Sequence, residues 1–455
     1  MKTMILFATV LLCATLSCMA QPSTEKIYTL AQLQDSALAN NESLRAAHYE
    51  VEAAKQQRRE AFTKYFPNVS ATGFAFRSNK PLVDVEVSLA DQISPEMGAA
   101  LASSLPTELV ASLADPMNIS MMKNGVVGSL TVVQPLFAGG QIVNGNKLAA
   151  VGESVSQIQA EMTTRDVERD VENLYYQLVS LSEKVLTLSA VDSLLSATAS
   201  DVDVAVRAGV ALPNDALQVA LRRNDIRAQS LQLNNAIRTV RTTLAVRCGL
   251  TDDNFSVEKG NELASRKPLM TNHETAVVNT LEMRLLDKAT EAAELQRRMD
   301  IGAAMPSVAV GAGLNYHNLM GDGTNFGMIF ATVSIPITDW WSSSHASKRG
   351  KANVRKAETK RGETARLLRI QMDRAADEAT EKSELVDIAR ESVEQATENL
   401  RLCRNRYTAG TATMSQLLEA QLLCQQARDK QTDAWTEMMK AQDEYDRLTI
   451  NSYCK

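Results

Sequence analysis

The chain has 455 residues with only 11 Pro, 20 Gly and 5% aromatic residues, and its formal net charge is -6. This composition favours long helices over compact mixed domains. The negative charge excludes the basic signature of a polyanion-binding protein, so we expect no nucleic acid among its partners. After the N-terminal segment, no run of about eighteen apolar residues occurs, so passage through a bilayer would require β-strands.

Residues 1–20 have the pattern of a secretory signal peptide. The pattern consists of Lys2, the apolar residues 4–16 and small residues that end at Ala20. The apolar part is too short to span a membrane, and we expect the mature chain to start at Gln21. Acylation at Cys18 is the less favoured alternative, because residues 15–17 lack a bulky aliphatic side chain three positions before the cysteine.

An internal repeat organises the rest of the chain. Phe66-Pro67 recurs as Met305-Pro306 at an offset of 239 residues, whereas Gln134-Pro135-Leu136 recurs as Ile335-Pro336-Ile337 at an offset of 201. The difference places 38 extra residues between the two motifs of the first copy. Surface loops tolerate such insertions. We therefore predict a first repeat at 21–249, a linker at 250–272, a second repeat at 273–449 and a tail at 450–455.

Each repeat contains a predicted pair of strands. Apolar and polar residues alternate on both sides of Gly321-Asp322-Gly323, which predicts a β-hairpin at 306–337. The first repeat shows the same alternation less cleanly, at about 66–77 and 125–137. The 38 extra residues then fall in a long loop at 78–124.

Long helices follow each strand pair. Seven apolar residues recur in steps of four and three, as in a coiled-coil seam: Val167, Val171, Leu174, Leu178, Leu181, Val185 and Leu188. We predict antiparallel helical hairpins, formed by helices 143–208 and 214–249 in the first repeat and by helices 342–408 and 415–449 in the second. The fold class is mainly α with a small β part.

The cysteines and histidines do not form a recognisable reactive site. Cys403 and Cys424 flank the second helix turn at unequal heights and should not pair, whereas a bridge between Cys248 and Cys454 is an open alternative. The histidines, at positions 48, 273, 317 and 345, lack the spacing of metal ligands. We expect no enzyme activity, no metal and no cofactor.

Four strands per chain are too few to close a membrane barrel, which needs at least about eight, so several chains would have to contribute. The chain resembles the TolC family of outer-membrane efflux and secretion channels. The resemblance is carried by Phe66-Pro67, Met305-Pro306, the junction at 134–140 (QPLFAGG) and the two hairpin tips at 207–217 (RAGVALPNDAL) and 407–420 (YTAGTATMSQLLEA).

This resemblance implies a homotrimer in the outer membrane of a Gram-negative-type cell, with a large periplasmic part. Its four transmembrane strands per chain would form a twelve-stranded trimeric β-barrel that continues into an α-helical tunnel. The chain would be the passive exit duct of a tripartite efflux pump or type I secretion system. A periplasmic adaptor would open it and an inner-membrane transporter would energise it, while outer-membrane lipid would surround the strands.

The resemblance also assigns roles to residues near the tips. Gln416 and Glu419 would occupy the pore entrance, where the family has acidic rings, and the tips at Gly209 and Gly410 would contact the adaptor. Asp215 and Tyr407 would belong to a gate latch. The basic latch position is Ala412 in this chain, so Arg404 or Arg406 would have to replace it.

A second interpretation remains open, in which the chain is a periplasmic or secreted coiled-coil scaffold without a pore. It accounts for the heptads but leaves the duplicated alternating strands unexplained. Membrane fractionation distinguishes the two interpretations.

Overall fold

The computed structural model describes residues 26–87, 94, 97, 100, 117–258, 270–319 and 323–449. The predicted signal peptide, including Cys18, and the C-terminal tail with Cys454 lie outside these ranges, so acylation and the Cys248–Cys454 bridge stay predictions. The chain divides into two compact units. Unit 1 comprises Met1–Ala53, Ser154–Lys288 and Glu358–Lys455, and unit 2 comprises Ala54–Glu153 and Ala289–Ala357.

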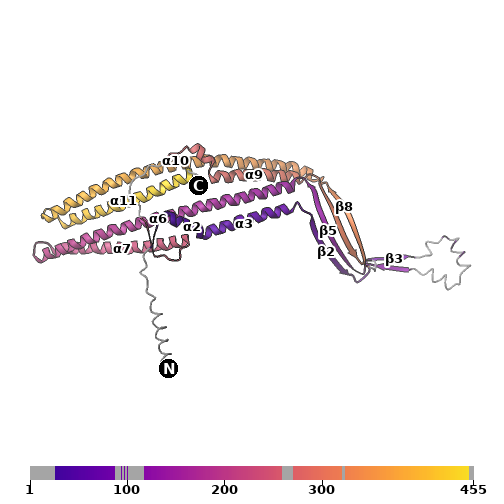
Figure 1. Cartoon of the computed structure of the whole chain (residues 1–455), viewed down its shortest axis with the longest axis horizontal. Helices are drawn as coiled ribbons and strands as arrows, with labels where there is room; N and C mark the ends of the chain where they lie inside the picture. The colour runs from indigo at the N-terminus through magenta and orange to yellow at the C-terminus, as the bar shows by residue number, and fades with distance from the viewer. Residues whose placement is uncertain are drawn as a thin grey trace, which may run out of the picture. The chain divides into compact units, whose positions relative to one another are not determined.

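The fold is mainly helical with a small strand content, which confirms the predicted class (Figure 1). The helices are α2 (Leu30–Asn40), α3 (Glu42–Thr63), α6 (Gln141–Arg207), α7 (Pro213–Cys248), α8 (His273–Val278), α9 (Leu281–Gly302), α10 (Asp339–Thr408) and α11 (Met414–Thr449). The strands are β1 (Lys26–Tyr28), β2 (Asn68–Arg77), β3 (Val83–Val87), β4 (Met117–Met121), β5 (Asn124–Ala138), β6 (Phe255–Val257), β7 (Ser307–His317) and β8 (Thr324–Ser334). None of the helices within the described ranges has an apolar segment that would span a lipid bilayer.

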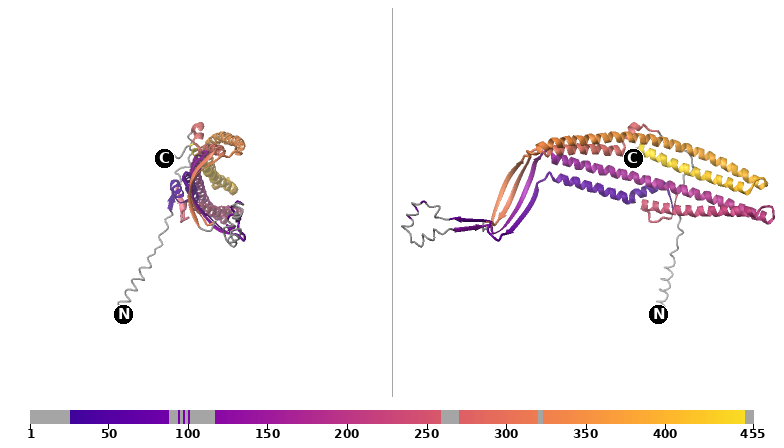
Figure 2. Two further views of the ribbon diagram at one scale, coloured as in Figure 1. Left: turned by 90° about the vertical axis from the view of Figure 1, so that its right-hand side faces the viewer. Right: turned by 180° about the vertical axis from the view of Figure 1, so that it is seen from behind.

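Unit 1 consists of two helical hairpins, α6 with α7 and α10 with α11, and shorter helices beside them (Figure 2). The predicted heptad seam of α6 faces the main core, where Val171 and Leu178 are fully buried. The same core takes residues from the other elements of the unit: Leu33, Ala37, Leu44, Val240, Leu244, Phe255, Val386, Trp435 and Met438. Each long helix is thus stabilised by neighbours far away in sequence.

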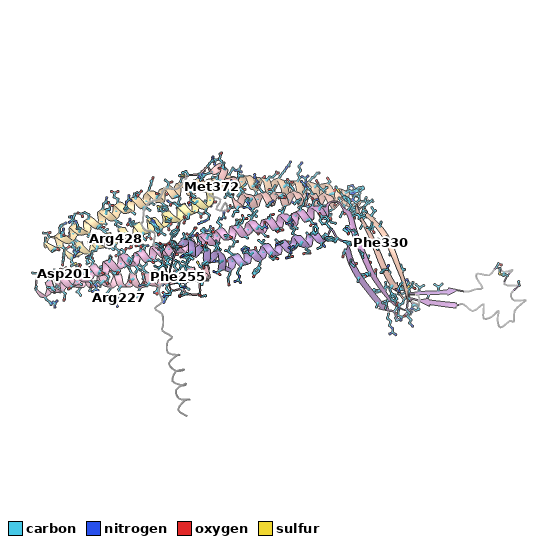
Figure 3. The ribbon with its side chains drawn as sticks, in the orientation of Figure 1. Asp201, Arg227, Phe255, Phe330, Met372 and Arg428 are labelled. Carbon is cyan, nitrogen blue, oxygen red and sulfur yellow. The ribbon has the colours of Figure 1, made fainter. Side chains whose placement is uncertain are left out.

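Two short strand pairs were not predicted. Strand β6, which contains the Phe255 labelled in Figure 3, lies inside the predicted linker and pairs in parallel with β1. The rings of Tyr28 and Phe255 pack edge to face, with centroids 5.5 Å apart. The hydroxyl of Tyr175 donates to the carbonyl of Glu258 at 2.6 Å and fixes the end of this pair. Strands β3 and β4 pair antiparallel within the predicted loop at 78–124, which is therefore not simply a loop.

The four strands of the unit 2 sheet are antiparallel in the order β2-β5-β7-β8, with a bulge in β5 between Pro135 and Phe137. Residues directly opposite each other share a face of a sheet. One face, called the apolar face below, carries Val69, Ala71, Leu130, Val132, Val310, Ala312, Leu314, Ile329, Ala331 and Val333. The other face carries many small and polar residues, including Asn68, Ser70, Thr72, Ser129, Thr131, Asn315 and Thr332, together with several aromatic rings.

Two glycines allow the turn between β5 and α6 to approach the end of α9. Gly139 has φ of +59°, which disfavours any side chain, and a Cβ added there would lie 2.0 Å from the carbonyl oxygen of Gly302. A Cβ added to Gly302 would lie 2.1 Å from the carbonyl oxygen of Gly139. Because both obstacles are backbone atoms, a methyl group at either position would force the two segments apart.

We expect Gly302→Ala to destabilise the protein by about 1–3 kcal/mol, because the backbone has to shift. Gly152→Ala is the matched control, since Gly152 also lies in a helix but has open space around it. That variant should gain about 1 kcal/mol from helix propensity. Denaturant unfolding of the detergent-solubilised protein measures both changes, and equal effects would contradict the close backbone contact.

A half-buried carboxylate joins three helices of unit 1. Glu172 of α6 accepts a hydrogen bond from Nε2 of Gln34 at 2.8 Å and another from the guanidinium of Arg447. Burial, assisted by the negative charges of Asp443 and Glu168, raises the pKa of Glu172 to about 7, although Arg447 opposes the shift. The folded state therefore holds a proton at pH values where the unfolded chain has already lost it.

Stability should consequently fall as the pH rises from about 4.5 to about 7, and this contribution should level off above that range. Glu172→Gln replaces the titrating carboxyl with a neutral amide. Relative to the wild type, the variant should therefore be most stable above pH 7, where the wild-type carboxyl is charged. The control Glu394→Gln changes an exposed carboxylate of α10 and should keep a constant offset. Melting temperatures of the three proteins between pH 4 and 8 test this, and an advantage of Glu172→Gln that shrinks with rising pH would disprove it.

Candidate functional site

The two hairpin tips of unit 1 have the same backbone conformation. Gly209 and Gly410 end α6 and α10 with φ of +76° and +72°. In each tip the following N–H reaches back five residues, from Val210 to the carbonyl of Ala205 at 2.9 Å and from Thr411 to the carbonyl of Arg406 at 2.8 Å. Glycine suits this left-handed position because it has no Cβ. The duplicated Ala-Gly pair therefore marks two equivalent turns.

The helices that return from the tips start with equivalent caps. Asp215 accepts a hydrogen bond from the backbone N–H of Leu212 at 3.4 Å, at the start of α7. In α11, Oε1 of Gln416 accepts from the N–H of Thr413 at 3.1 Å, and Oγ1 of Thr413 accepts from the N–H of Gln416 at 3.3 Å. This is a capping box. Asp215 and Gln416, which the repeat offset aligns, thus both stabilise helix starts.

Small-ligand sites are typically cavities of roughly 300–1,000 Å³, and the tip region of unit 1 holds a cavity of about 620 Å³. Residues of α6, α7, α10 and α11 line it. Three predicted latch positions, Asp215, Tyr407 and Arg404, are among the lining residues, and so is Ala412, which stands at the basic latch position. Asp215, Tyr407 and Arg404 therefore lie around the same cavity.

The polar groups around Tyr407 make its hydroxyl hard to ionise. Its partial burial and the nearby carboxylates of Asp215 and Asp201 raise the pKa of Tyr407 above its usual range. The phenol therefore stays protonated and can donate a hydrogen bond.

The two candidate arginines differ in placement. Arg404 lines the cavity, whereas Nη2 of Arg406 donates to the carbonyl of Thr411 at 3.4 Å within its own tip. Of the two, only Arg404 lines the same cavity as Asp201 and Asp215.

The two predicted pore-entrance residues lie on the exposed surface of α11. Gln416 is engaged in the capping box, as described above. Glu419 makes no hydrogen bond or ion pair within the part of the chain that the structure describes. Its carboxylate is therefore available to interact with groups outside this chain.

A buried glutamine lines the same cavity and was not predicted. Gln421 is 2% exposed, and neither atom of its amide has a hydrogen-bond partner among the described residues. It follows the buried Met414 and Leu417 at heptad spacing, so it interrupts an otherwise apolar seam. That interruption is the sequence signal that could have revealed it. An unpaired buried amide lowers stability.

A chain of polar contacts joins α7 to α11 and was also not predicted. The amide of Gln425 accepts from Nη2 of Arg222 at 2.7 Å and donates to Oε1 of Gln229 at 3.1 Å. Nearer the tips, Oγ of Ser415 donates to Oε1 of Gln218 at 3.1 Å. These hydrogen bonds join α7 of the first hairpin to α11 of the second.

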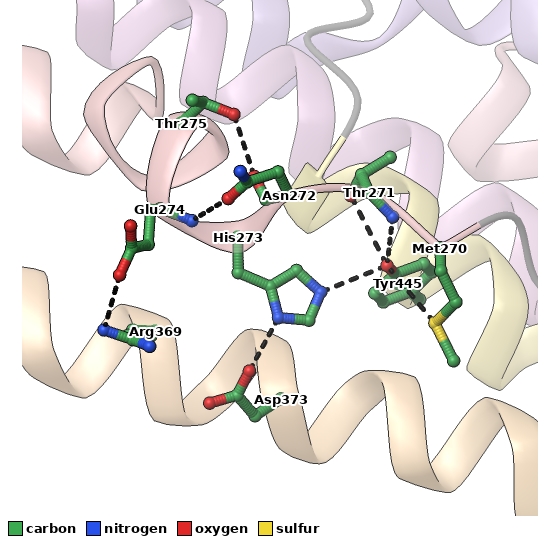
Figure 4. Close-up of polar contacts among 9 residues, drawn as sticks. All are labelled: Met270, Thr271, Asn272, His273, Glu274, Thr275, Arg369, Asp373 and Tyr445. Carbon is green, nitrogen blue, oxygen red and sulfur yellow. Dashed lines mark hydrogen bonds and ion pairs between the residues drawn. The ribbon is translucent and has the colours of Figure 1, made fainter.

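The histidine that lies in a polar cluster has a structural role. Nδ1 of His273 lies 2.6 Å from Oδ1 of Asp373, and Nε2 lies 3.1 Å from the hydroxyl of Tyr445 (Figure 4). The N–H of Thr271 donates to the same hydroxyl at 3.0 Å. The cluster thereby ties the start of α8 to α10 and α11. Within the described ranges, no group of three or more His, Cys, Asp and Glu side chains is placed to hold a metal ion.

Cys403 and Cys424 were expected not to form a disulfide with each other. Cys403 and Cys424 are both free thiols. Cys424 is buried in α11, and Cys403 is partly exposed in α10.

We expect Gln421→Leu to stabilise the protein by about 1–3 kcal/mol, because it removes an unpaired buried amide and restores the apolar seam. Gln425→Leu is the matched control on the same helix, since its amide is fully used, and it should destabilise the protein by a similar amount. Thermal unfolding measures the difference. Destabilisation by Gln421→Leu would show that its amide has a partner.

A family model matches part of the chain. Residues 274–448 match the family model described as Outer membrane efflux protein. No curated protein sequence matches the chain.

Solved structures share the fold over nearly the whole chain. The outer membrane protein VceC from Vibrio cholerae is 15% identical, with 92% of this chain and 95% of that chain covered and a TM-score of 0.70. The CmeC outer membrane channel of Campylobacter jejuni is 15% identical, with 92% and 85% covered and a TM-score of 0.72. The open state of the MtrE outer membrane channel of Neisseria gonorrhoeae is 17% identical, with 92% and 88% covered and a TM-score of 0.69.

Proposed function

We propose that this chain is the outer-membrane exit duct of an efflux pump. The match of its second repeat to the family model described as Outer membrane efflux protein supports the proposal. Three copies would join their sheets and hairpins into one conduit. The single observation that carries the proposal is the four-stranded sheet, which has an exposed apolar face and two strands with one unused edge each.

The apolar face suits a lipid environment. Its side chains are far more exposed than those of a soluble core, with Ile329 at 90% and Leu314 at 66%. Exposed apolar surface on this scale requires a partner, because water does not solvate it favourably. Strands of 10 to 15 residues are also long enough to cross the hydrocarbon layer when tilted.

The edges of the sheet suit closure by further copies. Strand β2 pairs with β5 and strand β8 pairs with β7, so each has one side free within the described sheet. Free strand edges expose unpaired N–H and C=O groups, which cannot remain unpaired in a membrane. Three chains would join β8 of one copy to β2 of the next and close a sheet of twelve strands.

The tips would form the regulated entrance of the conduit. Glu419 would contribute one carboxylate per copy, and three carboxylates around a threefold axis attract cations. Tyr407, Arg404 and Asp215 would hold the hairpins together in the closed state. A periplasmic adaptor would bind the tips near Gly209 and Gly410 and release them, and an inner-membrane transporter would supply the energy. The same duct could serve a type I secretion system.

The scaffold interpretation is weaker. A coiled-coil scaffold needs the heptad seams but has no use for a sheet with an exposed apolar face. A scaffold would also remain in the soluble fraction after cell lysis, whereas a duct requires detergent for extraction.

The test is single-channel recording on the purified protein in planar bilayers, after negative-stain imaging has established whether it is a threefold tube. The wild type should conduct and should be blocked by multivalent cations from the tip side. Glu419→Ala should weaken that block by about tenfold or more, because three carboxylates are lost, whereas Glu419→Asp should retain it. Absence of conductance would refute the duct. Unchanged block in Glu419→Ala would refute only the entrance role.

A further inference from the structure

Large apolar side chains are exposed where the sheet of unit 2 joins its helices. They are Phe62, Tyr65, Phe66, Leu136, Phe137, Trp340 and Trp341, and Trp341 is 80% exposed. The ring of Phe62 packs edge to face against Tyr65 and Phe66, with centroids 5.6 and 5.5 Å apart. Nε1 of Trp340 donates to the carbonyl of Ala304 at 3.1 Å, which fixes its ring. Tyr and Trp rings gather in this way at the border between hydrocarbon and water.

The helical segments of unit 2 next to this border are basic, although the whole chain has a net charge of -6. Their basic residues are Lys55, Arg58, Arg59, Lys147, Arg297, Arg298, Lys348, Arg349, Lys351, Arg355 and Lys356. Their acidic residues are Glu60, Glu153, Glu291, Glu294, Asp300 and Asp339. The excess of positive charge is thus local to these segments of unit 2.

Aromatic and basic groups meet in one groove between α3 and α6. Its volume is about 560 Å³, and Lys55, Arg58, Arg59, Phe62, Tyr65 and Lys147 are among the residues that line it. Nδ2 of Asn146 donates to the carbonyl of Ala61 at 2.9 Å and fixes the spacing of the two helices.

Most of the charge in the groove is uncompensated. Nη1 of Arg58 contacts Oε2 of Glu153 at 2.9 Å. The other three cations, Lys55, Arg59 and Lys147, are exposed and make no ion pair within the described ranges. They are therefore free to bind an anion.

We propose that this groove binds the headgroup of an anionic glycerophospholipid. The three free cations would contact the phosphate, and the rings of Phe62 and Tyr65 would lie along the start of the acyl chains. The inference rests on the proposed function, which places the sheet in a membrane and the groove at headgroup level. A soluble anion would bind the cations but would not contact the rings of Phe62 and Tyr65. Because the groove has both kinds of group, it suits a lipid better than free phosphate.

The test is native mass spectrometry of the purified full-length protein in detergent, titrated separately with phosphatidylglycerol, phosphatidylcholine and inorganic phosphate. We expect phosphatidylglycerol to bind at least about tenfold more tightly than phosphatidylcholine, and we expect little binding of inorganic phosphate. The triple variant Lys55→Gln, Arg59→Gln, Lys147→Gln should lose this preference. Raising the salt concentration should weaken the wild-type preference.

The matched control is the triple variant Arg227→Gln, Arg374→Gln, Lys430→Gln, which removes the same charge from exposed positions on unit 1. It should retain the wild-type preference, and both variants should keep the wild-type melting temperature within a few degrees. Equal binding of the two lipids, strong binding of inorganic phosphate, or a preference that survives in the first variant would overturn the proposal. Conductance of the wild type in bilayers tests the duct separately, so a conducting protein without lipid preference would refute this inference alone.

Discussion

The structure depends on the burial of helices that are too long to be covered by a compact core. Helices α6 and α10 have 67 and 70 residues, which corresponds to roughly 100 Å each. Such a helix is stable in water only if a neighbour covers its apolar stripe along most of its length. The hairpin turns at Gly209 and Gly410 bring α7 and α11, of 36 residues each, beside part of that length. The cores of unit 1 then take further residues from the other hairpin and from the short helices.

The sequence predicted the features that repeat over many residues. Heptad spacing identified α6 from Val167 to Leu188, alternation identified β7 and β8, and the Ala-Gly pairs located both tips. These signals are local, and each rests on several residues that agree with one another. Fold class and the family resemblance were therefore accessible before any coordinates.

The features that were missed depend on distant partners or on very few residues. Strands β1 and β6 have three residues each, which is too few for an alternating apolar pattern to be recognised. Their pairing also joins segments more than 200 positions apart. The unpaired amide of Gln421 and the contacts of Gln425 depend on how α7 and α11 pack, which composition does not reveal. The capping role of Gln416 is different, because Thr413 three residues earlier already forms a recognisable local motif.

The interruption at Gln421 has a consequence for how unit 1 responds to force or heat. Away from the tips, Val171, Leu178, Leu244 and Met438 are buried in one core, whereas the region near the tips has a cavity and an amide that has no hydrogen-bond partner among the described residues. Proteins open first where burial is least complete, in cooperative segments smaller than the whole domain. Amide hydrogen exchange should therefore be fast in the tip segments and slow in the middle. Such a gradient lets the ends of the hairpins separate and rejoin many times without unfolding the part that holds them in register.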